Sequence, residues 1–272
     1  MPDAPDIVTE NPWRILRRFT DARIGLGRVG VSLPTRELLT FQIAHAQARD
    51  AVHLPLDTDA LAADLRDLDG LGDPLVLRTL AADRDDYLRH PPKGETLDDA
   101  SVTALEDAGE EPPDLAIVIA DGLSSFAVQN NTVPFLTAFL NTLEGVSVSR
   151  PVIVTQGRVA IGDHVGEILG ARAVLVLIGE RPGLSSPDSL GLYFTWAPET
   201  GLHDARRNCI SNVRAAGLSH ARAAQRAAYL YAEARKIDTS GVALKDRSAA
   251  EEIDAGDRAT SFLSPPPEGR TP

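Results

Sequence analysis

The chain has 272 residues, 43% of them hydrophobic, which is enough to form a sizeable core in one or two domains. Its formal charge is -12, from 27 Lys and Arg against 39 Asp and Glu, and this charge opposes binding to nucleic acid or anionic lipid. No apolar run approaches the roughly 20 residues needed to span a bilayer, and the N-terminus lacks the pattern of a secretory signal. A single cysteine, Cys209, excludes an intrachain disulfide and a cysteine-based zinc cluster. We therefore expect a cytoplasmic protein that binds neither membranes nor nucleic acid.

Residues 12–110 are expected to form a helical region without strands, after a flexible segment at residues 1–11. Amphipathic spacing begins at Pro12, and a long helix is expected after Thr35, a candidate N-cap. The apolar stripe of this helix includes a histidine and consists of Leu38, Phe41, His45, Ala48 and Val52. Two more helices are expected over residues 60–70 and 74–90. The proline-rich, acidic stretch that follows predicts a domain boundary.

Residues 111–238 have the pattern of an α/β domain. Four short apolar runs predict strands within residues 114–122, 151–157, 171–180 and 192–198. Helical patterns alternate with these runs, which favours a mostly parallel sheet covered on both faces. The predicted fold is α/β: a helical N-terminal region followed by a Rossmann-like, mostly parallel sheet flanked by helices. An alanine-rich helix is expected before residue 238, and the polar residues 239–272 are expected to be a disordered or peripheral tail.

The ends of the first three predicted strands combine glycine with polar or charged side chains. They are Asp121-Gly122, the stretch from Gln156 to Asp163, and Gly179-Glu180. Ligands of open parallel sheets bind at the carboxyl ends of the strands, and glycine lets the backbone approach a ligand closely, so these ends predict one site. Around the third end, the segment IGERPGLSSPDSLG is expected to form a proline-braced rim in which a serine–aspartate turn holds the loop.

Common phosphate, hydrolase and metal motifs are absent from the sequence. The stretch GLGRVG at residues 25–30 fits the letters of a dinucleotide fingerprint but precedes a helical region instead of following a strand. There is no phosphate-binding P-loop and no G-x-S-x-G elbow, and the six histidines lack metal-ligand spacing. His45 is either a structural group with one hydrogen bond or a ligand contact. Cys209 is either a small buried hydrophobe or part of a polar loop at a site.

Five longer motifs resemble one family. They are RIGLGRVGVSLPTRELLTFQIAHAQARDAV, DLAIVIADGLSSFAVQ, QGRVAIGDHVGEILGA, LIGERPGLSSPDSLGLYFTWAP and RNCISNVRAAGLS. Together they are similar to the small (light) subunit of ethanolamine ammonia-lyase, from about Arg23 to Lys236. The motifs GERPGLSSPDSLG and NCISN are the most specific, because no general requirement of the fold dictates them.

The resemblance implies an enzyme that uses adenosylcobalamin to convert ethanolamine into acetaldehyde and ammonia by a radical mechanism. In the family, a large TIM-barrel subunit carries the substrate-binding residues, and the small subunit holds the corrin at the interface between the two chains. No catalytic residue is therefore expected in this chain, and no activity without the large subunit. Three cobalamin-contacting residues are implied at matching motif positions: Val159, Glu180 and Cys209. Arg181 either pairs with an acid or contacts the cofactor.

Two other functions remain open at this point. The same strand ends would suit a free-standing α/β protein that binds a nucleotide or another anion. In the second alternative, the chain is an assembly scaffold in which Glu180 and Cys209 are structural residues. Some members of the family are packaged in bacterial microcompartments by an N-terminal amphipathic extension, but little sequence precedes Pro12, so encapsulation is not expected here.

Overall fold

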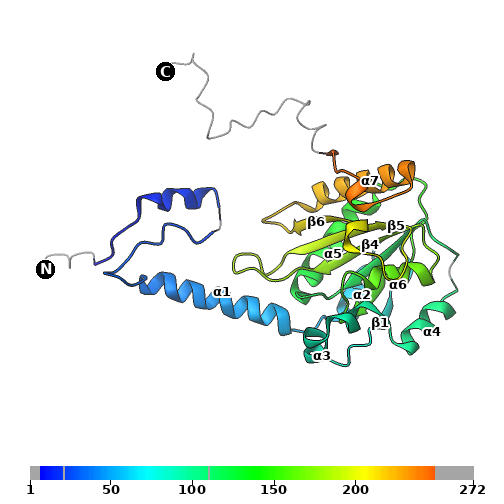
Figure 1. The fold of residues 1–272 in the computed structure, drawn as a ribbon, viewed down its shortest axis with the longest axis horizontal. Coiled ribbons are helices and arrows are strands. Elements are labelled where there is room, and N and C mark those ends of the chain that lie inside the picture. The colour runs from blue at the N-terminus through cyan, green and yellow to red at the C-terminus, as the bar shows by residue number, and fades with distance from the viewer. Residues whose placement is uncertain (1–6, 21, 110, 249–272) are drawn as a thin grey trace, which may run out of the picture.

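A single six-stranded sheet organises most of the chain. The computed structural model describes residues 7–20, 22–109 and 111–248 (Figure 1). The strand order is β1-β3-β2-β4-β5-β6, in which β1 to β4 run parallel and β5 and β6 are antiparallel to their neighbours. The strands are β1 (Leu75–Arg78), β2 (Leu115–Ala120), β3 (Val152–Thr155), β4 (Ala173–Gly179), β5 (Leu190–Trp196) and β6 (Arg207–Val213). The prediction of a mostly parallel α/β sheet is confirmed.

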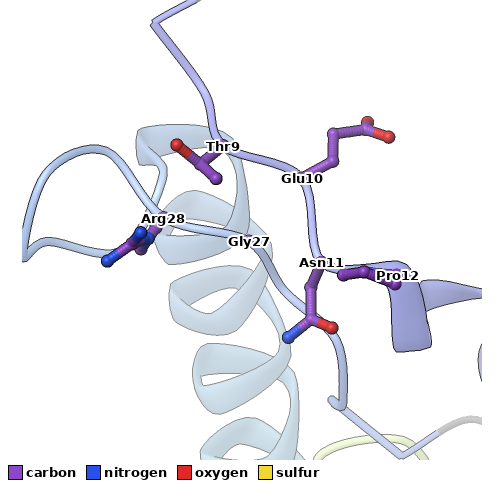
Figure 2. A pocket seen from close by; sticks show the side chains of 6 residues that line it. All are labelled: Thr9, Glu10, Asn11, Pro12, Gly27 and Arg28. Carbon is purple, nitrogen blue, oxygen red and sulfur yellow. The ribbon is translucent and has the colours of Figure 1, made fainter.

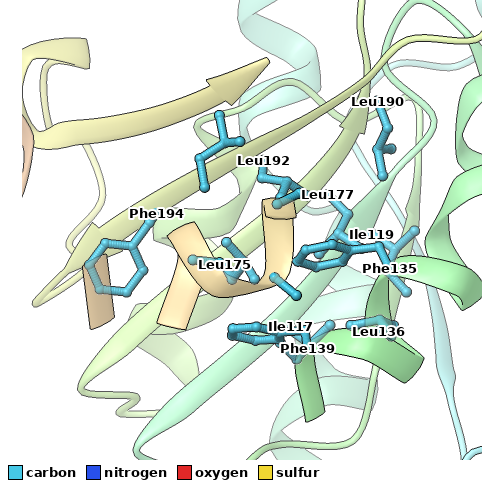
Figure 3. Packing of buried hydrophobic residues seen from close by; sticks show 14 of the residues in the cluster. Ile117, Ile119, Phe135, Leu136, Phe139, Leu175, Leu177, Leu190, Leu192 and Phe194 are labelled. Carbon is cyan, nitrogen blue, oxygen red and sulfur yellow. The ribbon is translucent and has the colours of Figure 1, made fainter. Parts of the chain in front are cut away.

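Helices cover the two faces of the sheet and form two cores. On one face lie α2 (Thr58–Arg66), α5 (Ser125–Leu140) and α7 (His220–Ile237). Figure 3 shows this core, where Phe135 and Phe139 of α5 lie near Ile117 and Leu175 of the sheet. On the other face lie α4 (Asp99–Asp107) and α6 (Ile161–Ile168). All residues of β2 and β4 are buried, as expected for central parallel strands covered on both sides.

Two strands differ from the sequence predictions. Residues 74–90 do not form one helix, because Leu75–Arg78 is the edge strand β1, paired in parallel with β3, and only Arg84–Arg89 forms a helix, α3. The expectation that residues 12–110 contain no strand is therefore wrong. Cys209 also lies in a strand, β6, and not in a loop. Both are edge strands, where one side lacks a partner and polar residues are tolerated: β1 has only three apolar residues before Arg78, and polar residues interrupt β6.

The segment after α7 is partly packed. Ser240 and Leu244 are buried, and the Ser240 hydroxyl accepts a hydrogen bond from the backbone N–H of Trp196 at 2.9 Å. The short 3-10 helix η4 (Gly241–Ala243) lies between them. The start of the tail expected at residues 239–272 thus belongs to the folded body, and the rest of that segment lies outside the described residues.

Residues 7–53 form an N-terminal arm that projects from the body (Figure 1). The arm contains the 3-10 helix η1 (Pro12–Arg18), a strand-like pairing of Thr9 with Arg28, and α1 (Thr35–His53). The residues before Pro12 were expected to be flexible, but Thr9 exchanges two backbone hydrogen bonds with Arg28, and residues 1–6 lie outside the described part. The N-cap of α1 is Pro34, so Thr35 is the first helical residue and not the cap.

A shallow pocket of about 320 Å³ lies where the two segments of the arm pair (Figure 2). Its lining residues come from these two segments and are Thr9, Glu10, Asn11, Pro12, Gly27 and Arg28. No described helix, in the arm or in the body, is long and apolar enough to cross a bilayer.

Candidate functional site

One pocket collects residues from the carboxyl ends of the three central strands. Its volume is about 390 Å³, and its lining residues include Gly122 and Leu123 after β2, Arg158 and Val159 after β3, and Glu180 and Arg181 after β4. Strands β3 and β4 flank β2, and the helices that follow β2 and β3 lie on opposite faces of the sheet. This is the topological switch point at which open α/β sheets bind ligands. The three strand ends that the sequence analysis selected therefore line one pocket, and its role as a ligand site stays a prediction.

The glycines at these strand ends allow the loops to approach one another closely, as well as allowing a ligand to approach the backbone. Gly122 has a φ of +57°, and a Cβ there would collide with the Gly179 carbonyl. The Gly179 oxygen accepts a hydrogen bond from the backbone N–H of Leu123 at 2.9 Å, which ties the end of β4 to the turn after β2. A side chain at either glycine would therefore push apart the loops that line the pocket.

Val159 lies on a loop whose backbone is held in place by hydrogen bonds to side chains of other segments. The carbonyl of Gln156, whose φ is +59°, accepts a hydrogen bond from the Thr79 hydroxyl at 3.0 Å. The next residue, Gly157, donates its N–H to Asp121 at 3.0 Å. Two residues later, Val159 is half-buried in the last turn before α6. Its apolar side chain therefore has a fixed place at the pocket wall.

A buried charge pair lies beneath this loop. Asp121 is 4% exposed, and its carboxylate lies 3.5 Å from Nη1 of Arg84. Arg84 also donates to the Gln156 side chain at 3.3 Å and to the Val52 carbonyl, in the last turn of α1, at 2.7 Å. Burial raises the pKa of Asp121 above its ordinary value, although Arg84 and the N–H of Gly157 oppose this shift. Arg84 thus connects the base of the arm with the loop that carries Val159.

Tyr87 forms the floor of the pocket between two arginines. The guanidinium carbons of Arg158 and Arg84 lie 4.1 Å and 4.8 Å from the centre of its ring. Its hydroxyl donates to the Gly157 carbonyl at 3.1 Å. Burial, together with the nearby Asp121, raises the pKa of Tyr87 to about 12, so the phenol stays neutral. Both cations are therefore partly engaged by the protein itself.

Glu180 is oriented by two donors that bind the same carboxylate oxygen. Oε2 accepts a short hydrogen bond from the Ser189 hydroxyl and a second, at 3.3 Å, from the backbone N–H of Asn212. Among the described residues, none donates a hydrogen bond to Oε1. Glu180 thus has one oxygen fixed by the protein and one available to a donor in the pocket.

Cys209 adjoins the pocket without lining it. It is exposed on β6, directly opposite Tyr193 of β5, and Tyr193 does line the pocket. The thiol lies 3.3 Å from the Ser211 hydroxyl, which is also exposed. Burial and the neighbouring Cys209 raise the pKa of Tyr193. Cys209, Ser211 and Tyr193 thus form an open patch of sheet beside the pocket, next to Glu180 and Val159.

Two further sequence expectations have clear outcomes. Among the described residues Arg181 has no ion-pair partner and is exposed at the pocket rim, so pairing with an acid is not observed there and contact with a ligand stays a prediction. His45 lies on the exposed surface of α1, stacked on Phe41 at 6.1 Å, far along the chain from the residues of the pocket. It is neither a buried structural group nor a lining residue of this site.

The rim after Glu180 is held both by hydrogen bonds within the expected serine–aspartate turn and by contacts from outside it. Gly183 and Ser186 exchange two backbone hydrogen bonds, at 3.1 and 3.2 Å. The Pro187 carbonyl accepts from the Ser124 hydroxyl at 2.7 Å, and the Asp188 carbonyl accepts from Asn131 at 2.9 Å. The loop is therefore braced by the start of α5.

Four residues that shape the site were missed by sequence reasoning. Ser189 and Tyr193 belong to motifs that had been noted, but no pattern distinguished them from their neighbours. Arg84 and Tyr87 lie in a segment expected to be a plain helix, far from the strand ends in sequence. No group of three or more His, Cys, Asp or Glu that would hold a metal ion exists among the described residues.

The fold and the pocket define a class: a Rossmann-like α/β protein with an open pocket at its strand ends. The model of the family described as ethanolamine ammonia-lyase light chain matches residues 10–245. The chain is 55% identical to the ethanolamine ammonia-lyase small subunit of Pseudomonas aeruginosa over 265 residues. The aligned region covers 95% of this chain and 96% of that protein. It is 52% identical to the small subunit of Pseudomonas fluorescens strain Pf0-1, over 97% of this chain and 99% of the relative.

The match spans the arm, the sheet and the helices that cover it. The chain belongs to the family of ethanolamine ammonia-lyase small (light) subunits. The family resemblance read from the sequence motifs is confirmed.

Proposed function

We propose that this chain is the small subunit of an adenosylcobalamin-dependent ethanolamine ammonia-lyase. With a large TIM-barrel subunit it converts ethanolamine into acetaldehyde and ammonia, and it holds the corrin at the subunit interface. One observation carries the proposal. Val159 and Glu180 line the same pocket, and Cys209 lies on the open patch of sheet beside it. These three positions were selected by the family resemblance, and they are far apart in the sequence.

The chemistry of the site suits the rim of a corrin, which is broad, largely apolar and bears amide side arms. The free Oε1 of Glu180 is an acceptor for an amide N–H, and Val159 offers apolar contact. Cys209 and Ser211 are small, exposed and weakly polar, so a flat ligand can lie over the sheet beside them. When bound, adenosylcobalamin supplies the radical chemistry, and the protein supplies binding and orientation.

This chain's own contribution is to hold the ligand in one orientation. Ser189 and Asn212 hold the Glu180 carboxylate in one orientation, so that its side chain loses little rotamer freedom when the ligand binds. The loop with Val159 is similarly fixed through Gly157 and Gln156. We place the catalytic residues on the large subunit, and we expect the isolated chain to be inactive. We propose a cytoplasmic location for the complex.

One observation favours the alternative of a free-standing nucleotide- or anion-binding protein. Arg158 and Arg181 both line the pocket and would attract an anion. However, Arg158 is stacked on Tyr87 and donates to the Tyr87 carbonyl at 3.3 Å, which leaves it less free to bind a phosphate. The carboxylate of Glu180 in the same pocket also repels an anion. We therefore favour the corrin.

The test is a cobalamin titration of the complex of this chain with the cognate large subunit, followed by the absorption spectrum of the cofactor. We expect the complex to bind cobalamin and to release acetaldehyde from ethanolamine only when adenosylcobalamin is present. Glu180→Ala is expected to weaken cobalamin binding at least tenfold. Glu180→Gln, which retains an acceptor oxygen, should weaken it less, and Glu199→Ala, at an exposed glutamate beyond the other end of β5, is the matched control.

Two outcomes would contradict the proposal. Tight nucleotide binding by the lone chain, without any response to cobalamin, would support the free-standing alternative. An unchanged cobalamin affinity in Glu180→Ala would support the scaffold alternative, in which Glu180 is structural.

A further inference from the structure

The N-terminal arm exposes more apolar surface than its own contacts explain. Most of the large hydrophobic side chains that are exposed in the described residues belong to residues 7–53. Trp13 is 67% exposed, Ile15 56% and Val31 105%. Single exposed apolar residues are common, but such a concentration in one segment marks an interaction surface.

Helix α1 is apolar on two sides, and both sides are exposed. Leu39 and Ile43 are four residues apart and form one stripe, with exposed fractions of 53% and 61%. Leu38 and Phe41 form a second stripe, rotated well away from the first, at 44% and 39%. Of the helix itself, only Ala44 and Ala51 are buried. A helix that is apolar on several sides is normally enclosed by protein, and the body of this chain covers only a narrow strip of α1.

The exposed apolar area of the arm is large enough for a stable interface. The arm has about a dozen large apolar side chains that are partly exposed. With an area of about 150–250 Å² for each aromatic side chain, the exposed parts of the whole set add up to roughly 1,000 Å². A typical stable interface buries about 800 Å² on each partner. The arm alone therefore reaches the size of one side of a specific protein–protein interface.

The charge of the arm differs from that of the rest of the chain. Arginines outnumber Asp and Glu along residues 7–53, whereas the whole chain has a charge of -12. Some of these arginines already have partners inside the arm, as Arg17 has in Glu37 at 3.3 Å. The partner surface that complements the arm is therefore apolar, with carboxylates at its edges.

The base of the arm is joined to the candidate cofactor site. Arg84 binds the Val52 carbonyl at the end of α1 and also reaches Asp121 and Gln156 beneath the pocket. The Leu54 carbonyl accepts from the Ser125 hydroxyl at 2.5 Å, at the start of α5. A partner chain that covers the strand-end pocket therefore also lies next to the base of the arm.

We infer that the N-terminal arm is a docking surface for the large subunit, which encloses α1 against both of its apolar stripes. The inference rests on the proposed function, because the large subunit is the chain that lies across the cofactor site. It adds a second contact area, far from the cofactor, that holds the two subunits together whether or not cobalamin is bound.

The experiment compares full-length variants in binding to the cognate large subunit without cobalamin, by isothermal titration or co-elution. The double variant Leu39→Glu/Ile43→Glu places two charges on one exposed stripe of α1. The matched control is Val242→Glu, which changes an apolar residue that is 80% exposed on the body. We expect the arm variant to lose at least 100-fold in affinity and the control to stay within about twofold. Both should keep the wild-type circular dichroism, because the altered side chains are exposed.

The outcomes separate this inference from the proposed function. If the wild-type chain binds no large subunit, the proposed function fails. If the wild type binds and the arm variant binds equally well, the docking inference alone is overturned. If the arm variant instead dissociates a dimer of the isolated chain and leaves large-subunit binding unchanged, the arm binds a second copy of this chain. That outcome also overturns the inference.

Discussion

The N-terminal arm and the body of the molecule follow opposite rules of burial. In the body, every residue of β2 and β4 is buried, and helices cover the sheet on both faces. In the arm, η1 has no buried residue and α1 has two. Both regions are rich in apolar side chains, so composition alone does not separate them. The difference shows that the apolar residues of the body form the core of its fold, whereas those of the arm remain exposed and available to a partner.

The largest effect is expected from a change in the core of the body. Phe135 is fully buried and stacks on Phe139 at a ring distance of 5.4 Å. Phe135→Ala should lower the free energy of unfolding of the isolated chain by about 4 kcal/mol, since it removes a large buried side chain and leaves a cavity. Urea unfolding measures this.

The contrasting variant in the arm is Phe41→Ala. Phe41 is 39% exposed, so the same change there should cost less than about 1 kcal/mol in the isolated chain. Equal losses for the two variants would contradict the comparison between a self-sufficient body and a partner-dependent arm.

The next effect concerns the joint between the two regions. Asp121→Ala leaves Arg84 partly buried, without its carboxylate, and removes the acceptor of the Gly157 N–H. We expect a loss of about 3 kcal/mol in the free energy of unfolding, as for other broken buried charge pairs. Thermal or urea unfolding of the full chain provides the measurement. Asp73→Ala, which breaks the exposed pair with Arg66, is the control and should change stability by less than about 0.5 kcal/mol.

A smaller effect is expected at the cofactor site. Ser189→Ala removes the hydroxyl that binds Glu180 but leaves the carboxylate in place. The affinity of the complex for cobalamin should fall by about fivefold, roughly 1 kcal/mol, since one positioning hydrogen bond is lost. The stability of the arm and its binding to the large subunit should not change. A loss as large as that of Glu180→Ala would mean that Ser189 contacts the ligand itself.

The smallest effect is a pH dependence inside the body. Burial lowers the pKa of His220, whose Nε2 lies 2.9 Å from Oδ1 of Asn131. The folded state then binds fewer protons than the unfolded state below the ordinary histidine pKa of 6.5, so stability should fall as the pH drops from 7 toward 5. His220→Gln should reduce this slope in urea unfolding at several pH values. His164, whose pKa burial also lowers, should contribute a slope of the same sign. An unchanged slope would exclude His220 as a source.

The central strands of the sheet could be predicted from the sequence because they are buried on both sides. Continuous apolar runs mark β2, β3 and β4, and the rule that ligands bind at strand ends then led to Glu180 and the loop of Val159. Edge strands β1 and β6 escaped, because the three apolar residues of β1 were assigned to a helix and because polar residues, which are tolerated at the edge of a sheet, interrupt β6. The same property misled the interpretation of Cys209, whose polar neighbours indicate an exposed strand and not a loop.

The supporting residues of the site could not be predicted, because their roles depend on contacts between distant segments. Arg84 and Tyr87 precede the pocket loop by about seventy residues and reach it only because β1 pairs with β3. No periodicity or motif encodes such a contact. Likewise, the spacing in α1 predicted an apolar stripe, but it carried no information on whether the chain's own body covers that stripe.

By itself, the sequence determined the family of this protein, the alternation of strands and helices after residue 111, and two residues of the candidate site. These depend on local patterns: the burial of short apolar runs, turns at glycine, and motifs that match over most of the chain. The tertiary structure decided which loops meet, that Ser189 donates a hydrogen bond to Glu180 at the pocket, and that α1 leaves the body with its apolar stripes exposed. The physical reason is that burial and hydrogen-bond partners are properties of packing, which distant segments create together.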